Sequence, residues 1–175
     1  MSTTPEILLE TARFRVVEYT VATAGEQRPL KKQVVVHPGA VVILPLLEGD
    51  RVCLIRNFRI AVDRELIELP AGTLDRPESP LNTAQRELQE ETGFTAINWQ
   101  ELAGFFMSPG ILHERIHAFV ARDLQPGEAA LEPGEVIENL IVGWEDAVAM
   151  ALDGRIEDAK SVALILKWDR LRSAH

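Results

Sequence analysis

The sequence predicts an α+β domain in which helices pack on the faces of a sheet. Short runs with the residue types of β-strands fill most of the chain from Arg13 onward, and one helical segment, from about Pro80 to Thr92, interrupts them. Two further helical stretches, at about 145–152 and 159–171, close the chain. With 175 residues and no internal repeat or clear linker, the chain fits one domain with a small extension.

The strand-like runs are bounded by turn residues such as the segment AGEQRP and Glu48-Gly49-Asp50, which is predicted to form a hairpin turn. The expected strands are residues 13–21, 30–37, 40–46, 51–58, 66–70, 99–106, 115–121 and 136–144. The central helix has clear end signals: Ser79 suits the N-cap, Pro80 the first turn and Gly93 the left-handed stop position. In the last helix the apolar residues lie near one face, as an amphipathic helix requires.

Charge and cysteine content exclude several classes of function. There are 18 Lys and Arg against 27 Asp and Glu, so the net charge of −9 argues against binding nucleic acid or an anionic membrane through a positive field. Cys53 is the only cysteine and lies in the apolar run RVCLI, which predicts a small buried side chain. No apolar stretch reaches about 18 residues, and the N-terminus lacks a signal pattern. We therefore expect a cytoplasmic protein without membrane partners.

An acidic cluster lies on the central helix. Glu87, Glu90 and Glu91 stand at positions i, i+3 and i+4 and share one face, while Glu78 precedes the helix and can turn back toward it. Arg86 can reach Glu90 or bend toward Glu78. Two interpretations remain open from the residues alone: a solvated acidic face, or a site where Mg²⁺ binds a few carboxylate oxygens and keeps positions for substrate phosphates.

The segment from Gly72 to Phe94, GTLDRPESPLNTAQRELQEETGF, resembles the Nudix box at every specified position. The resemblance implies an α/β/α sandwich with a mixed sheet, and hydrolysis of nucleoside diphosphates linked to a further group with Mg²⁺ or Mn²⁺. It implies metal ligation by Glu87, Glu91 and Glu90, with the backbone carbonyl of Ala71 often joining them. Arg86 would orient the glutamates, and Gly72 and Gly93 would permit the flanking turns.

Other segments are similar to the ADP-ribose pyrophosphatase branch of that family. They are RNFR at 56–59, ELIELPAG at 65–72, Pro109 at 16 residues after Gly93, and GRIEDAKSVALILKW at 154–168. The resemblance implies cleavage of ADP-ribose into AMP and ribose 5-phosphate. Two alternatives stay open: another nucleoside diphosphate sugar such as GDP-mannose, and a nucleotide-sensing domain without catalysis. The candidate substrate-binding residues are Arg59, Arg56 and Pro109. The two arginines are candidates because guanidinium groups pair well with phosphate oxygens, and Pro109 because of its position in the branch.

In that branch the glutamate that activates water usually comes from a loop after the box. The matching stretch here is ALEPGEVIEN, in which Glu135 follows a Pro-Gly turn and is the first candidate for the general base. Glu132 is the second candidate, and Glu138 lies within the expected strand. His37 is expected to be a structural turn residue, and the three tryptophans are expected to pack in the core or at an interface.

Residues 1–37 precede the catalytic domain, 38–175, and are too few to form a core of their own. In ADP-ribose pyrophosphatases such antiparallel strands cross over to a second subunit, so the resemblance implies a homodimer through the N-terminal strands. Lys31 and Lys32 occupy a region where the family often places an arginine that reaches the partner's site.

Overall fold

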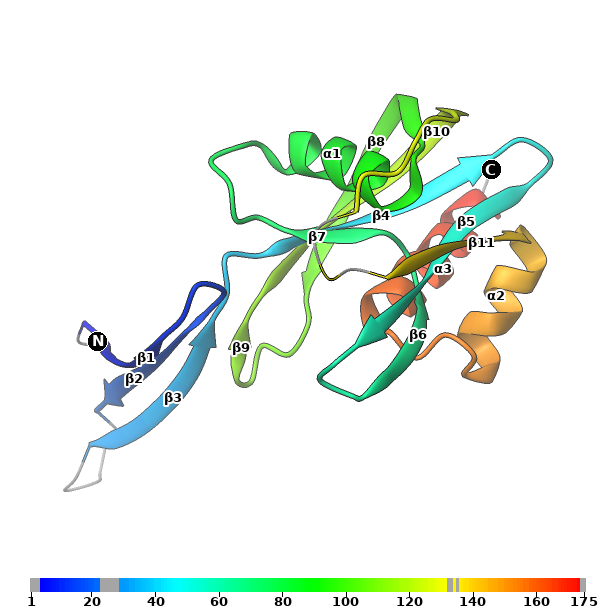
Figure 1. Ribbon diagram of the computed structural model, residues 1–175. Helices are drawn as coiled ribbons and strands as arrows, with labels where there is room; N and C mark the ends of the chain where they lie inside the picture. The colour runs from blue at the N-terminus through cyan, green and yellow to red at the C-terminus, as the bar shows by residue number, and fades with distance from the viewer. Residues whose placement is uncertain (1–3, 23–28, 132–133, 135, 174–175) are drawn as a thin grey trace.

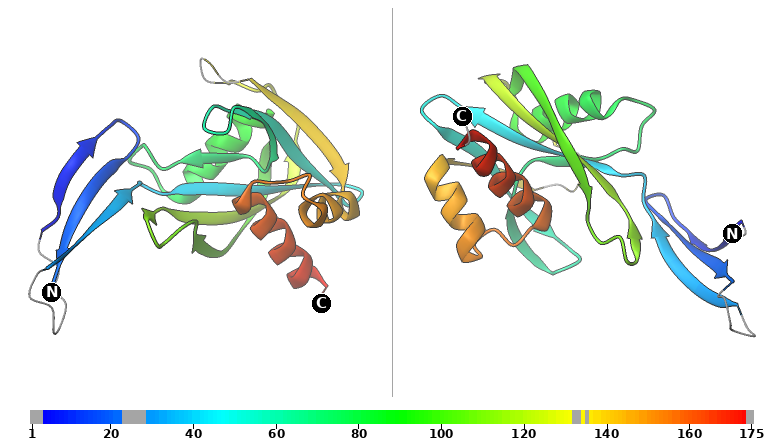
Figure 2. Two further views of the ribbon diagram at one scale, coloured as in Figure 1. Left: turned by 90° about the horizontal axis from the view of Figure 1, so that it is seen from below. Right: turned by 180° about the vertical axis from the view of Figure 1, so that it is seen from behind.

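The computed structural model describes residues 4–22, 29–131, 134 and 136–173. A seven-stranded sheet carries helix α1 (Pro80–Thr92) on one face and helices α2 (Trp144–Asp153) and α3 (Ala159–Arg172) on the other, as Figures 1 and 2 show. A separate small sheet extends from one end of this body. The predicted α/β/α sandwich with additional N-terminal strands is confirmed.

The main sheet is mixed, with one parallel strand pair among antiparallel ones. Its strands are β4 (Ala40–Leu47), β5 (Arg51–Arg59), β6 (Arg64–Glu68), β7 (Ala71–Thr73), β8 (Thr95–Phe106), β10 (Arg115–Gln125) and β11 (Ile137–Gly143). The order is β11-β5-β4-β10-β8, with β6 paired to β5 and β7 paired to β4. Strands β4 and β10 are parallel, and the other pairs are antiparallel. The first half of β4 therefore borders the short β7, and its end borders β5.

Alternation along β4 divides the core between the two faces. Val41 and Ile43 face α1, where they join Ala84 and Leu88 of the helix. Ala40, Val42 and Leu44 point to the opposite face and pack in the cluster that α2 and α3 cover. Because successive side chains of a strand point to opposite faces, a strand buried on both sides reads as a continuous apolar run. The helix that carries the acidic cluster is thus anchored to the centre of the sheet by its apolar face.

The N-terminal sheet has the order β1-β2-β3-β9. Its strands are β1 (Glu6–Glu10), β2 (Arg15–Val21), β3 (Leu30–Val36) and β9 (Leu112–His113). The first three are antiparallel, and β9 pairs with β3 in parallel. Figure 2 shows this sheet projecting from the sandwich. Along β1, Ile7, Leu8 and Leu9 remain 51%, 49% and 50% exposed, so the chain leaves apolar side chains of this strand in contact with water.

The end signals of α1 operate as predicted. The Ser79 side chain accepts a hydrogen bond from the Asn82 amide at 3.2 Å, and Gly93 adopts the left-handed conformation with φ 76°. Three short strands were not predicted, namely β1, β7 and β9. The predicted strand at 136–144 is one residue too long at each end: β11 begins at Ile137, and Trp144 begins α2, where its amide donates to the Asp50 carbonyl at 2.8 Å.

Cys53 is fully buried in β5, as predicted. Burial raises the pKa of its thiol to about 12, so the group stays protonated and packs as a small apolar side chain. Trp144 is also buried, and its indole N–H donates to Asp169 Oδ1 at 3.0 Å. Within the described part of the chain, no helix combines the length and the apolar character that a membrane crossing needs.

Candidate active site

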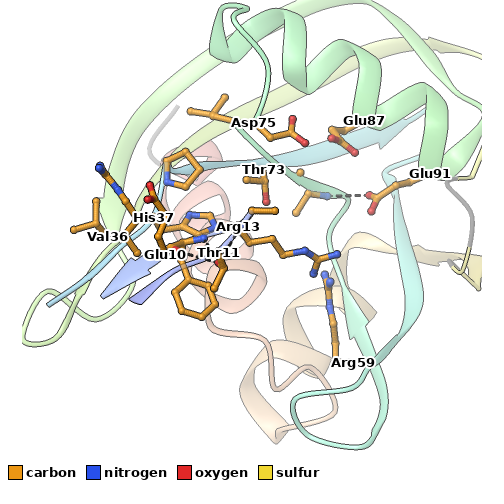
Figure 3. Close-up of a pocket in the computed structure, with 17 residues that line it drawn as sticks. Glu10, Thr11, Arg13, Val36, His37, Arg59, Thr73, Asp75, Glu87 and Glu91 are labelled. Atoms are coloured by element: carbon orange, nitrogen blue, oxygen red, sulfur yellow. Dashed lines mark hydrogen bonds between the residues drawn. The ribbon is translucent and has the colours of Figure 1, made fainter. Parts of the chain in front are cut away.

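A cavity of about 680 Å³ lies between the start of the main sheet, α1 and the turn that joins β1 to β2. Figure 3 shows Glu87 and Glu91 entering it from α1, and Arg59 and Arg13 from two other segments. The described residues that line it are Glu10–Arg15, Val36–Pro38, Arg59, Ala71–Asp75, Glu87 and Glu91. Its volume is in the range of pockets that bind small molecules and cofactors.

Strand β7 and helix α1 form the acidic wall of the cavity. The Ala71 amide donates to Glu91 Oε2 at 2.9 Å, so a backbone bond holds this carboxylate, which is only 5% exposed, against the strand. Gly72 lies beside Glu87: a Cβ added at Gly72 would overlap the Glu87 carboxyl group. The glycine thus leaves room for that carboxylate.

Arg86 links the glutamates of the acidic cluster. Its Nη1 donates to Glu87 Oε1 at 2.9 Å and to Glu90 Oε2 at 2.7 Å, while Nε and Nη2 donate to Glu78 Oε1 at 3.1 and 3.0 Å. The arginine makes both of the contacts that its position in the sequence allowed. Burial acts to lower the pKa of Arg86, but the hydrogen bonds that it donates to Glu90 and Glu78 and the charge of Glu87 raise it. The guanidinium therefore offsets the repulsion between these carboxylates.

Arg59 lies at the end of β5 and is held by a bidentate pair with Glu68 at the end of β6. Its Nε donates to Glu68 Oε1 at 2.8 Å and its Nη2 to Oε2 at 2.6 Å. Burial acts to raise the pKa of Glu68, but the hydrogen bond from Arg59 and the charge of Lys160 outweigh it and lower that pKa. Glu68 therefore stays ionised and keeps the guanidinium at the cavity.

The turn between β1 and β2 supplies residues that the sequence did not indicate. Thr11 Oγ1 accepts from the amides of Arg13 and Phe14 at 3.2 and 3.0 Å and donates to the Phe14 carbonyl at 2.8 Å. In Figure 3 the guanidinium group of Arg13 points toward that of Arg59, so two cations face the two carboxylates of α1. Asp75 also lines the cavity. No linear motif marks Thr11, Arg13 or Asp75, because they reach the cavity only through the fold.

The remaining predicted residues differ in whether they reach the cavity. Arg56 pairs with Glu65 at 3.3 Å, and neither Arg56, Pro109 nor Glu90 is among the described residues that line the cavity. Glu135 and Glu132 lie outside the described residues, and Glu138 is exposed on β11. His37 does form the expected turn contact, since its Nδ1 accepts from the Gly39 amide at 3.2 Å, and it also lines the cavity. Lys31 pairs with Glu18 within the N-terminal sheet.

Among the described residues, no three His, Cys, Asp or Glu side chains converge closely enough to form a complete metal site. Two of the candidate ligands, Glu87 and Glu90, share Arg86 Nη1. The donor chemistry nevertheless fits a hard divalent cation that keeps its own waters. Glu87 and Glu91 of α1 border the cavity together with Ala71, and the missing side chain at Gly72 leaves room for the Glu87 carboxylate.

Comparison with known proteins identifies the family. The NUDIX domain family matches residues 36–165, which is most of the chain. The chain belongs to the Nudix family. This Nudix protein is 36% identical over 146 residues to the ADP-ribose pyrophosphatase of Bacillus subtilis, covering 82% of this chain and 78% of that one. It is also 36% identical over 136 residues to the GDP-mannose pyrophosphatase of Yersinia enterocolitica, covering 73% and 71% of the two chains.

A solved structure of an ADP compounds hydrolase has the same fold. It superposes on this Nudix protein with a TM-score of 0.83 at 20% identity, and the match covers 99% of this chain and 94% of the other. The superposition therefore includes the N-terminal strands as well as the sandwich. The family and the fold that the sequence predicted are both confirmed.

Proposed function

We propose that this Nudix protein hydrolyses the pyrophosphate of ADP-ribose to AMP and ribose 5-phosphate with the help of a divalent metal ion. The observation that carries the proposal is a single cavity in which Glu87 and Glu91 face Arg59 and Arg13. A diphosphate bound there would meet cationic groups on one side and metal-ligating carboxylates on the other. In the reaction, water adds to one phosphorus and the bond from the bridging oxygen to that phosphorus breaks.

The metal ion would be held by Glu87, Glu91 and the carbonyl of Ala71. Glu90 would be a further ligand once its carboxylate gives up the hydrogen bond from Arg86 and binds the metal instead. We propose Mg²⁺, with Mn²⁺ as a substitute, because both accept carboxylate oxygens and water. When bound, the ion neutralises phosphate charge and lowers the pKa of a coordinated water. Arg86 would keep the glutamates aligned, and Arg59 would hold a phosphate through the donors that Glu68 does not use.

The general base is proposed to be Glu135, with Glu132 as the second candidate. A carboxylate that removes a proton from the attacking water contributes about 10²–10⁴-fold to the rate, so the double variant Glu132→Gln/Glu135→Gln is expected to lose turnover on that scale. Glu138→Gln is the matched control in the same segment, because Glu138 lies on β11. The measurement is kcat against pH for the three proteins. Unchanged turnover in the double variant would show that neither Glu132 nor Glu135 is the general base.

The proposed substrate is tested by a hydrolysis panel with Mg²⁺ that contains ADP-ribose, GDP-mannose, UDP-glucose and NADH. The name of the Bacillus subtilis relative supports ADP-ribose, and that of the Yersinia enterocolitica relative supports GDP-mannose as the second candidate. Preferential release of AMP and ribose 5-phosphate is expected. A higher kcat/KM for GDP-mannose would make GDP-mannose the preferred substrate. Absence of turnover with Mg²⁺ or Mn²⁺ would favour a nucleotide-sensing domain.

We further propose that the protein acts in the cytoplasm as a homodimer joined through residues 1–37. The exposed apolar side chains of β1 support it, because grouped apolar surface often marks an interface. Ile7→Lys/Leu9→Lys is expected to weaken dimerisation by at least about tenfold, since each lysine would place a charge in the contact. Light scattering coupled to size exclusion measures this, with Leu152→Lys on α2 as the exposed control. A wild-type protein that is monomeric at micromolar concentration would contradict the proposal.

A further inference from the structure

Four charged residues form a continuous chain from the start of α3 to the cavity. Arg59 is paired with Glu68 as described above, and Lys160 Nζ donates to Glu68 Oε2 at 2.9 Å and to Asp158 Oδ1 at 2.8 Å. Asp158 is the N-cap of α3 and accepts from the Ser161 amide at 3.0 Å. These ion pairs thus join strands β5 and β6 to the N-terminus of α3.

Burial separates the member that reaches the cavity from those that support it. The side chain of Arg59 is 39% exposed and lines the cavity, whereas that of Glu68 is 1% exposed. Lys160 and Asp158 are largely buried, and none of the three residues behind Arg59 is among the described cavity-lining residues. The direct ion-pair route from Lys160 to the cavity therefore runs through Glu68 and Arg59.

The backbone around Glu68 is tied to the same helix. The Leu69 amide donates to Ser161 Oγ at 2.7 Å, and Ser161 Oγ donates to Asp158. Both Leu69 and Ser161 are fully buried. The end of β6 is therefore fixed to the first turn of α3 by the hydrogen bond from the Leu69 amide to Ser161 as well as by the ion pair between Lys160 and Glu68.

A buried carboxylate is stable only when cationic or hydrogen-bonding partners surround it. Glu68 accepts from both Arg59 and Lys160, and Lys160 also donates to Asp158, so two cations balance two carboxylates in this network. Without Lys160, the buried Glu68 would have one cationic partner fewer, which is costly in a poorly solvated site.

We propose that Lys160 is a positioning residue for substrate binding, which holds Glu68 from behind and thereby fixes the guanidinium of Arg59 in the cavity, where the N–H donors that Glu68 does not use can hold a phosphate. The proposal rests on the proposed function, in which Arg59 binds a substrate phosphate. It assigns a role in substrate binding to α3, whose residues do not border the cavity.

The kinetic test is a double-variant cycle with Lys160→Met and Arg59→Ala, assayed on ADP-ribose with Mg²⁺. Lys160→Met is expected to lower kcat/KM by about tenfold, mainly through KM, which is the size of one charge-assisted contact. Lys160→Arg should restore most of the loss because it keeps a cation beside Glu68. In the Arg59→Ala background, Lys160→Met should have no further effect. Lys167→Met, which removes a lysine that donates to the Ala103 carbonyl from the same helix, is the matched control.

The alternatives give different results. An equal loss from Lys160→Met with and without Arg59 would show a purely structural role and overturn the proposal. Normal kinetics in Arg59→Ala would overturn it as well, while leaving the hydrolase function intact. If the wild-type protein turns over no nucleotide, the proposed function fails, and the positioning role is decided by exchange of the Arg59 Nε proton in NMR spectra. That exchange should be faster in Lys160→Met than in wild type, and unchanged exchange would overturn the role.

Discussion

Replacement of Gly72 with alanine is expected to remove most of the turnover and leave the fold intact. The added Cβ would overlap the carboxyl group of Glu87, which must then move away from the cavity. Because the obstructing atoms are the far end of a flexible side chain, neither β7 nor α1 has to shift. If Glu87 binds the metal as proposed, displacing it should cost more than the roughly 10–100-fold that loss of an outer-shell partner costs. The measurement is kcat/KM over a range of Mg²⁺ concentrations, where half-maximal activity should require more metal.

Gly143→Ala is the matched control for this substitution. Gly143 ends β11 and precedes α2 with φ −64°, and the nearest atom to an added Cβ would be Asp146 Oδ2 at 3.5 Å, an ordinary contact. This variant should retain wild-type kinetics. Both glycine variants should melt within a few degrees of wild type, on the scale of about 2–4 °C per kcal/mol for a chain of this size. Wild-type activity in Gly72→Ala would mean that the position of Glu87 does not matter to the reaction.

The second large effect is expected from Glu91→Gln. The glutamine retains an oxygen that can accept the Ala71 amide, so the link between β7 and α1 survives while the negative charge is lost. An amide is a weaker ligand than a carboxylate for Mg²⁺, and turnover should fall by at least about a hundredfold. Activity at saturating Mg²⁺ and the apparent metal affinity are the two measurements.

A glutamate away from the site provides the comparison. Glu145→Gln removes the same charge from the exposed first turn of α2 and should leave both measurements at the wild-type level. Full activity in Glu91→Gln would exclude Glu91 as a metal ligand. If the variant unfolded instead, the wild-type carboxylate of Glu91 would be a structural group held by the Ala71 amide, and thermal melting separates that result from a catalytic loss.

Local sequence signals located the helices well. The ends of α1 follow from an N-cap hydroxyl at Ser79, a proline in the first turn and a glycine at the stop position, and each of these acts on its immediate neighbours. The short strands β1, β7 and β9 were missed because they have few residues and little pattern of their own. Strands β7 and β9 become strands only through hydrogen bonds to partners far along the chain, β4 for β7 and β3 for β9, whereas β1 pairs with the adjacent β2.

The same distinction applies to the candidate site. The helical spacing of Glu87, Glu90 and Glu91 placed three carboxylates on one face, and the possible partners of Arg86 could be named from the sequence. Arg59 was named as well, but its partner Glu68 was not, because the two residues meet only when β5 and β6 pair. Thr11 and Arg13 had no signal at all, since a turn between the first two strands reaches the cavity only through the arrangement of the two sheets.

Helical spacing in the sequence determined the acidic helix, and the contiguous motif from Gly72 to Phe94 determined the family and, through that resemblance, the sandwich fold. Tertiary structure decided which cations face that helix, and it placed the Lys160 and Glu68 pair behind Arg59. The physical reason is that ion pairs form between side chains that the fold brings together: Glu68 and Lys160 are 92 residues apart in the chain and in contact in the molecule.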